Sequence, residues 1–122
     1  MIDCIQMNLH RAQIAQVELL NEINDSPETI CFLQEPYAVR KKLVMRPTGH
    51  QVFPEGQLLE RPRTALFIPR CFPAVELTNL SNKDCTVGLI KIDRQITVLA
   101  SVYLDINAVS YTHLTLPTNR EV

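Results

Sequence analysis

Two different periods of apolar and polar positions follow each other at the start of the chain, and each predicts a different element. Residues 2–8 mix apolar and short polar side chains in near alternation, which is typical of a strand. Between residues 11 and 24 the apolar residues recur at helical spacing, at Ala12, Ala15, Leu19, Leu20 and Ile23. Pro27 ends this predicted helix, because proline lacks the donor that would continue the hydrogen-bond ladder. The apolar run at residues 29–35 predicts a second strand.

Strand, helix and strand in this order predict a βαβ unit. Its right-handed crossover places the two strands parallel in one sheet. Ile14 and Val17 fall outside the main apolar stripe of the helix, so we expect other elements to cover it more widely than a surface helix.

The rest of the chain predicts strands without further long helices. Residues 37–62 lose any clear period and are interrupted by proline and glycine, which indicates loops around one short strand near residues 51–53. Strands are predicted again at residues 64–68, 74–80, 85–92 and 96–104, the last two as a hairpin. A βαβ unit followed by several strands predicts a mixed sheet in an α/β or α+β sandwich.

Composition narrows the class of protein. The chain has 122 residues and 46% apolar content, which is enough for one domain with a core. Its four cysteines show no zinc-ligand spacing, and their apolar neighbours suggest small buried side chains in a reducing compartment. We find neither a signal peptide nor an apolar run of membrane-spanning length, and therefore expect a soluble intracellular protein with no membrane partner. A formal net charge of −1 argues mildly against a nucleic-acid partner.

The predicted βαβ unit brings two polar side chains together. Asn8 closes the first strand in Ile5-Gln6-Met7-Asn8, and Glu35 follows the second in Gln34-Glu35-Pro36. Parallel strands of an open sheet hold ligands beyond their carboxyl ends. Magnesium prefers oxygen ligands and typically takes one or two carboxylates together with phosphate and water. Glu35 therefore suits a metal-binding role.

Together with Ser101-Val102-Tyr103, these motifs resemble the endonuclease/exonuclease/phosphatase family. The amino-acid sequence from Ile5 to Ala15 and from Thr29 to Tyr37 is similar to that of the endonuclease domain of jockey-like non-LTR retrotransposons. The resemblance implies a DNase I-like sandwich, with residues 1–107 as a partial domain. It further implies that Glu35 holds Mg²⁺, that Asn8 orders the site around the scissile phosphate, and that the Tyr103 hydroxyl faces that phosphate. The implied activity is nicking of target DNA, whose 3′-hydroxyl then primes reverse transcription.

Basic residues beside these motifs are candidates for contact with DNA phosphates. One group consists of Arg40, Lys41, Lys42 and Arg46, and a second of Arg61, Arg63 and Arg70. A solvated charged loop explains them equally well. We assign His10 no role.

Each candidate site residue also has a structural explanation. An isolated glutamate at a strand end usually faces solvent. Asn8 could cap the following helix, which would occupy the oxygen that the site needs. Tyr103 could be an ordinary strand aromatic with a hydrated hydroxyl.

The resemblance also requires an Asp-x-Asn motif on a separate strand and a late Ser-Asp-His motif, and neither occurs here. Asp105-Ile106-Asn107 lies too close to Tyr103 and is interpreted as the loop after its strand. Residues 108–122 resemble translated sequencing-adapter DNA, with a natural flexible terminus as the alternative. We therefore expect an inactive fragment, with exposed apolar surface or an unpaired edge on the last two strands.

Three functions stay open at this point. The first is a fragment of a nuclear retrotransposon endonuclease, whose partners are duplex DNA and a reverse transcriptase domain. The second is another phosphodiesterase or phosphatase of the same fold. The third is a non-catalytic α/β binding module in which Glu35 is structural.

Overall fold

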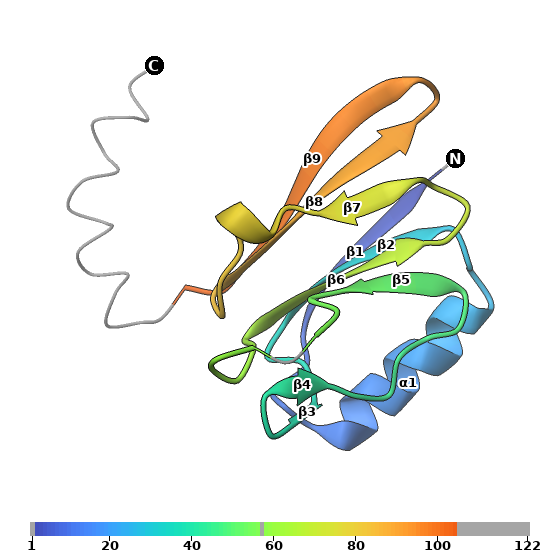
Figure 1. Cartoon of the computed structure of the whole chain (residues 1–122). Helices are drawn as coiled ribbons and strands as arrows, with labels where there is room; N and C mark the ends of the chain where they lie inside the picture. The colour runs from blue at the N-terminus through green and yellow to red at the C-terminus, as the bar shows by residue number, and fades with distance from the viewer. Residues whose placement is uncertain (1, 57, 105–122) are drawn as a thin grey trace, which may run out of the picture.

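The protein is described from a computed structural model, which covers residues 2–56 and 58–104. Within these ranges the chain alternates between short strands and two helical segments (Figure 1). In chain order the elements are β1 (Asp3–Asn8), α1 (Gln13–Asn24), β2 (Thr29–Gln34), β3 (Ala38–Val39), β4 (Lys42–Leu43), β5 (His50–Phe53), β6 (Thr64–Pro69), β7 (Ala74–Glu76), the 3₁₀ helix η1 (Thr78–Leu80), β8 (Cys85–Ile92) and β9 (Gln95–Val102). The predicted tail at residues 108–122 and the Asp105-Ile106-Asn107 loop lie outside the described residues.

The predicted βαβ unit is confirmed. β1 and β2 pair in parallel, from Asp3 opposite Thr29 to Asn8 opposite Gln34. The helix between them begins two residues later than predicted, at Gln13, because Arg11 has a φ of 57° that a right-handed helix excludes. Asp25 follows the helix, and the backbone N–H groups of Asp25 and Ser26 bond back to the carbonyls of Glu22 and Ile23, at 3.2 and 3.1 Å.

The first sheet is mixed, as predicted, and has four strands in the order β1-β2-β6-β5. β6 lies between β2 and β5 and is antiparallel to both. All six β6 residues are buried, which matches the continuous apolar run of a strand covered on both faces. The short strand predicted near residues 51–53 is β5. The β3–β4 hairpin within residues 37–62 gave no periodic signal because each strand has only two residues.

The second sheet has three antiparallel strands in the order β7-β8-β9, and β8 and β9 form the predicted hairpin. The strand predicted at residues 74–80 is wrong beyond Glu76, because η1 replaces its second half. The backbone N–H of Leu80 bonds to the Leu77 carbonyl, which closes the 3₁₀ turn, while Ser81 Oγ donates to the same carbonyl at 2.9 Å. β9 likewise ends at Val102 and not at Leu104.

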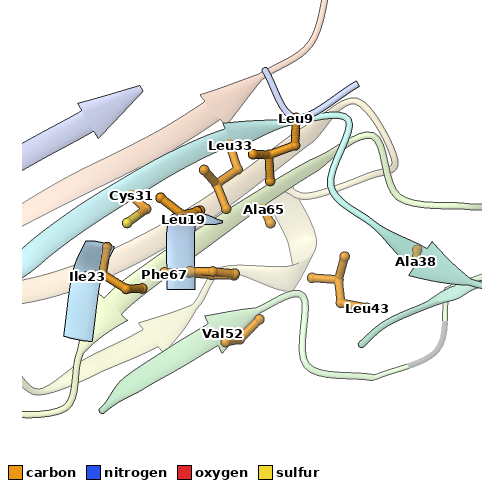
Figure 2. Packing of buried hydrophobic residues seen from close by; sticks show 10 residues of the cluster. All are labelled: Leu9, Leu19, Ile23, Cys31, Leu33, Ala38, Leu43, Val52, Ala65 and Phe67. Carbon is orange, nitrogen blue, oxygen red and sulfur yellow. The ribbon is translucent and has the colours of Figure 1, made fainter. Parts of the chain in front are cut away.

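The two sheets and the helix form three layers, with α1 on one face of the four-stranded sheet and β7-β8-β9 on the other (Figure 1). Leu19 and Ile23 of α1 pack on Cys31, Leu33 and Phe67 in the first core cluster (Figure 2). The alternate residues of the first sheet, Ile30, Phe53, Leu66 and Ile68, form a second cluster with Ile90 of β8 in the other sheet.

Gly88 of β8 lies close to side chains of the first sheet. A Cβ atom built on Gly88 would lie 3.2 Å from two carbons of the Phe53 ring and 3.4 Å from Leu66. A side chain at this position would therefore push the sheets apart or displace the Phe53 ring.

The prediction that other elements cover Ile14 and Val17 is wrong, since their side chains are 73% and 38% exposed. The polar Gln16 is buried in their place, at 1% exposure. Its amide nitrogen donates to the carbonyls of Val44 and Met45 at 2.8 and 3.1 Å, and its oxygen accepts the Tyr37 N–H at 2.9 Å. Because its hydrogen bonds are satisfied, this glutamine can be buried where the loop at residues 37–45 crosses the helix.

The cysteines only partly match the prediction of small buried side chains. Cys31 is buried and Cys85 partly buried, but Cys4 and Cys71 are exposed, and all four are free. Cys4 is exposed because β1 is an edge strand, and Cys71 because it lies in a turn after β6. Burial raises the pKa of the Cys31 thiol to about 12, with smaller contributions from Cys4 and Glu22.

The outer face of the three-stranded sheet is apolar and exposed, as predicted for the last two strands. Ile96 and Val98 of β9 are 67% and 58% exposed, and Val75 of β7 is 54% exposed. In the part of the chain that the structure describes, α1 covers the outer face of the first sheet but no helix covers this one. No helix among the described residues has the length and apolar character needed to cross a membrane.

Candidate functional site

Five strand ends meet at one edge of the two sheets and define what we call the site edge. β1 and β2 end there in parallel at Asn8 and Gln34, and antiparallel β6 begins there at Thr64. In the second sheet, β9 ends at Val102 opposite the first residue of β8, Cys85. Glu35 and Tyr103 each follow directly after a strand that ends at this edge. The fold therefore brings all three predicted site residues, Asn8, Glu35 and Tyr103, to one edge of the sandwich.

The backbone of Glu35 is held on both sides. Its N–H donates to the Arg63 carbonyl at 2.9 Å, and its own carbonyl accepts the Arg11 N–H at 2.8 Å. Glu35 has a φ of 50°, in the left-handed region that is uncommon for residues other than glycine. Such conformations persist where the surroundings fix them and are common at functional sites. The Glu35 carboxylate is partly exposed and forms neither an ion pair nor a hydrogen bond with any other described residue.

Asn8 does not cap the helix, so that structural explanation is wrong. Ala12 occupies the N-cap position of α1, and no side chain caps the helix there. Asn8 is exposed, and its Oδ1 accepts the backbone N–H of His10 at 2.8 Å. This local turn orients the Asn8 side chain at the end of β1 and uses one acceptor, while the amide nitrogen still has its donors for a ligand.

Arg63 connects the Glu35 backbone to Tyr103. Its guanidinium carbon lies 4.7 Å from the centre of the Tyr103 ring, and its Nε lies 2.6 Å from Asp84 Oδ1. The Tyr103 N–H in turn donates to the Asp84 carbonyl at 2.8 Å. Arg63 therefore fixes the ring of Tyr103 at the site edge through a cation–π contact and a charged hydrogen bond.

Buried hydroxyl and amide groups join the two sheets just beneath the site edge. Ser101 Oγ donates to the Leu33 carbonyl at 2.8 Å and accepts from Gln34 Nε2 at 3.3 Å. Beside them, the hydroxyls of Thr64 and Thr86 lie 2.7 Å apart. Sequence reasoning gave none of these residues a role. The signal available to it was that Gln34 and Ser101 both lie inside the two site motifs.

The donor chemistry of the site edge suits a hard cation, but the edge offers few protein ligands. Among residues 2–56 and 58–104, no group of three or more histidine, cysteine, aspartate or glutamate side chains could hold a metal ion. Glu35 supplies one carboxylate and Asn8 one amide at adjacent strand ends. A magnesium site with one carboxylate and the substrate phosphate fits this set, whereas a closed structural site does not.

The predicted basic residues lie in separate places. Arg40 and Lys41 form the turn of the β3–β4 hairpin, which begins three residues after Glu35, and Lys42 is exposed on β4. Arg46 instead donates to the Val52 carbonyl beside β5, at 3.1 Å.

The second basic group does not form one contact, so that prediction is wrong. Arg61 donates to the Ala38 carbonyl at 3.0 Å and Arg70 to the Thr48 carbonyl at 2.9 Å. Arg63 is held by Asp84 and Tyr103. Arg61 and Arg63 lie in the loop before β6, whereas Arg70 follows the opposite end of that strand, so the three arginines do not form one group.

No protein-family model and no curated protein sequence matches the chain. A solved structure does match it: the endonuclease domain of TRAS1, a telomere-specific non-LTR retrotransposon, at 22% sequence identity and a TM-score of 0.71. The match covers 99% of this chain and 53% of that domain, so the chain spans about half the length of the structure it matches. The protein therefore shares its mixed α/β, DNase I-like fold with about half of an endonuclease domain.

Proposed function

We propose that this chain is part of a metal-dependent endonuclease of a jockey-like non-LTR retrotransposon, which nicks target DNA to prime reverse transcription. The observation that carries the proposal is the site edge, where Asn8 ends β1, Glu35 follows the adjacent parallel strand β2 and Tyr103 follows β9 of the facing sheet. The three residues also lie in the sequence motifs that carry the family resemblance. The fold shared with an endonuclease domain supports the same conclusion.

In this proposal each residue has a separate task at one scissile phosphate. Glu35 would hold Mg²⁺, which when bound would supply charge stabilisation at the phosphoryl oxygens. Asn8 donates a hydrogen bond from its amide nitrogen to the phosphate, while its local turn keeps the side chain at the strand end. Tyr103 presents its hydroxyl from the facing sheet, with the ring held by Arg63.

The exposed turn that follows Glu35 offers a basic surface to DNA on either side of the scissile phosphate. Arg40, Lys41 and Lys42 would contact backbone phosphates there without reading the base sequence. Arg46 belongs to the same predicted group but lies beside β5.

We further propose that the polypeptide with this sequence does not nick DNA by itself. It carries neither a separate Asp-x-Asn motif nor a Ser-Asp-His motif, which would supply a histidine and its orienting aspartate. General acid–base groups typically contribute about 10²–10⁴ in rate, and one metal carboxylate does not replace them. In the complete element protein, a reverse transcriptase domain would use the nick, in the nucleus.

The experiment is Mg²⁺-dependent binding of a labelled DNA duplex, followed by fluorescence anisotropy, with plasmid nicking measured in parallel. We expect binding that Mg²⁺ strengthens in the wild-type chain and not in Glu35→Gln, without nicking by either. Glu28→Gln is the matched control, because Glu28 is an exposed carboxylate just before β2, at the end of that strand opposite to the site edge. Equal effects of the two substitutions would overturn the proposal.

The second candidate is a non-catalytic α/β binding module. It is favoured by the lack of a multi-residue metal cluster among the described residues and by the local bond that uses Asn8 Oδ1. Here Glu35 would only shape the turn after β2. A Glu35→Gln variant with unchanged metal and DNA affinity would support this module.

A further inference from the structure

A polar pocket with a volume of about 190 Å³ opens beside β5, and the site edge does not use it. Its polar walls come from Arg46, His50, Gln51, Glu55 and Arg70. β5 is the edge strand at the opposite side of the four-stranded sheet from β1, which carries Asn8. His50 pairs with Pro69, so Arg70 follows the end of β6 that lies away from Thr64 and the site edge.

The two arginines of the pocket are anchored, and each uses only part of its guanidinium group. Arg46 donates Nη2 to the Val52 carbonyl at 3.1 Å, and Arg70 donates Nε to the Thr48 carbonyl at 2.9 Å. A guanidinium has five N–H donors, so several remain on each. Neither arginine forms an ion pair with any carboxylate in the described part of the chain. The pocket therefore presents two positive groups, both reachable from solvent, whose charges are not neutralised by a direct partner.

The histidine of the pocket is buried and anchored to the backbone. His50 is 2% exposed, and its Nε2 lies 2.8 Å from the Thr29 carbonyl. Burial lowers the pKa of His50 below its usual value, the Thr29 carbonyl opposes this, and the Arg70 charge lowers the pKa further.

Glu55 is the one carboxylate of the pocket and partly offsets the two arginines. Glu55 also lies near Glu76 of β7, whose pKa is raised mainly by burial. A hydrogen bond from the Glu55 backbone lowers the pKa of Glu76, and the Glu55 charge raises it. Glu55 thus weakens, without cancelling, the attraction of the pocket for an anion.

We propose that this pocket binds a phosphate group between Arg46 and Arg70. Guanidinium groups match the geometry of phosphate oxygens, and both arginines line this pocket with N–H donors that their backbone bonds leave available. The volume is several times the ~30 Å³ that a water molecule occupies in the liquid, which leaves room for a tetrahedral ion. The phosphate belongs either to a nucleic-acid backbone or to a free phosphate compound. The proposal does not rest on the endonuclease function.

The test is a titration of the full chain with inorganic phosphate, followed through backbone amide NMR signals at constant ionic strength set by chloride. We expect saturable shifts at Gln51, Val52 and Arg70. Arg46→Gln and Arg70→Gln should each weaken binding at least about tenfold. Arg94→Gln is the matched control, since it removes the same charge from the exposed turn between β8 and β9 and should leave binding unchanged.

Glu55→Gln gives an independent test that does not depend on a loss of function. Removing this carboxylate should tighten phosphate binding by several-fold, because a repulsive charge leaves the pocket. A short DNA strand that competes with phosphate for the same signals would identify the source as a nucleic-acid backbone, and a strand without effect would identify a free phosphate compound. Shifts that do not saturate, or that are the same in Arg46→Gln, Arg70→Gln and Arg94→Gln, would overturn the proposal.

Discussion

The guanidinium carbon of Arg63 lies 4.7 Å from the centre of the Tyr103 ring, while its Nε lies 2.6 Å from Asp84 Oδ1. The two residues are distant in sequence and come from the loop before β6 and the end of β9. Because the Arg63 carbonyl also accepts the Glu35 N–H, a single residue connects the two predicted site residues of opposite sheets.

Arg63→Ala should lower the free energy of unfolding by about 1–3 kcal/mol, since it removes a partly buried charged hydrogen bond and a cation–π contact. Arg63→Lys should recover only part of this loss, because an ammonium group lacks the planar shape. Urea denaturation measures both. The control is Lys83→Ala, which breaks the exposed Lys83–Glu60 pair at 3.2 Å and should cost less than about 1 kcal/mol. Equal losses in Arg63→Ala and Lys83→Ala would contradict this role.

Ser101→Ala should destabilise the protein by about 1–3 kcal/mol, because it leaves the buried Gln34 amide without its bond partner. Thermal unfolding followed by circular dichroism measures the change. Thr97→Ala, on the exposed part of the same strand, is the control and should stay within about 0.5 kcal/mol of wild type. A Ser101→Ala variant with unchanged thermal stability would mean that the sheets are held together here by packing alone.

His50 should make the fold sensitive to acid. The pKa of His50 is lowered in the folded state, chiefly by burial and further by Arg70. As the pH falls below 6.5, the ordinary histidine pKa, this side chain therefore gains its proton in the unfolded chain before it does so in the folded chain. Stability from this group is present above pH 6.5 and is lost as the pH falls through the folded pKa. The difference in unfolding free energy between wild type and His50→Gln should therefore shrink as the pH falls below 6.5. The same pH dependence in His10→Gln, an exposed control, would argue against His50 as the cause.

The exposed apolar face of β7-β8-β9 should limit solubility. Ile96→Thr with Val98→Thr should raise the soluble fraction with little change in melting temperature, because both side chains face solvent. Leu99→Thr is the matched control: this side chain packs against the second core cluster, so its loss should destabilise the fold. Sedimentation velocity measures the association state. A wild-type chain that is already monodisperse at high concentration would contradict the prediction.

The sequence predicts best what short-range patterns determine. The period of residues 2–35 gives the βαβ unit, and the unit itself places Asn8 and Glu35 on neighbouring strand ends. The alternation in residues 85–102 likewise gives the β8–β9 hairpin. In each case the same period sets both the element and the face that it buries.

Contacts between distant segments could not be predicted in this way. Gln34 and Ser101 are 67 positions apart, and only the packing of two sheets makes them partners. Gln16 is buried because a loop offers it backbone carbonyls, which a helical period cannot indicate. The same holds for Arg63: in the sequence it is one of several basic residues, and only the fold brings it into contact with Tyr103.

Magnesium titration of the full chain, followed by amide NMR in wild type and Glu35→Gln, tests the proposed site edge most directly. We expect weak, saturable shifts at Asn8, Glu35 and Tyr103 in wild type that disappear in Glu35→Gln and remain in Glu28→Gln. Shifts spread over unrelated surface carboxylates, or unchanged by Glu35→Gln, would contradict a metal site at these strand ends.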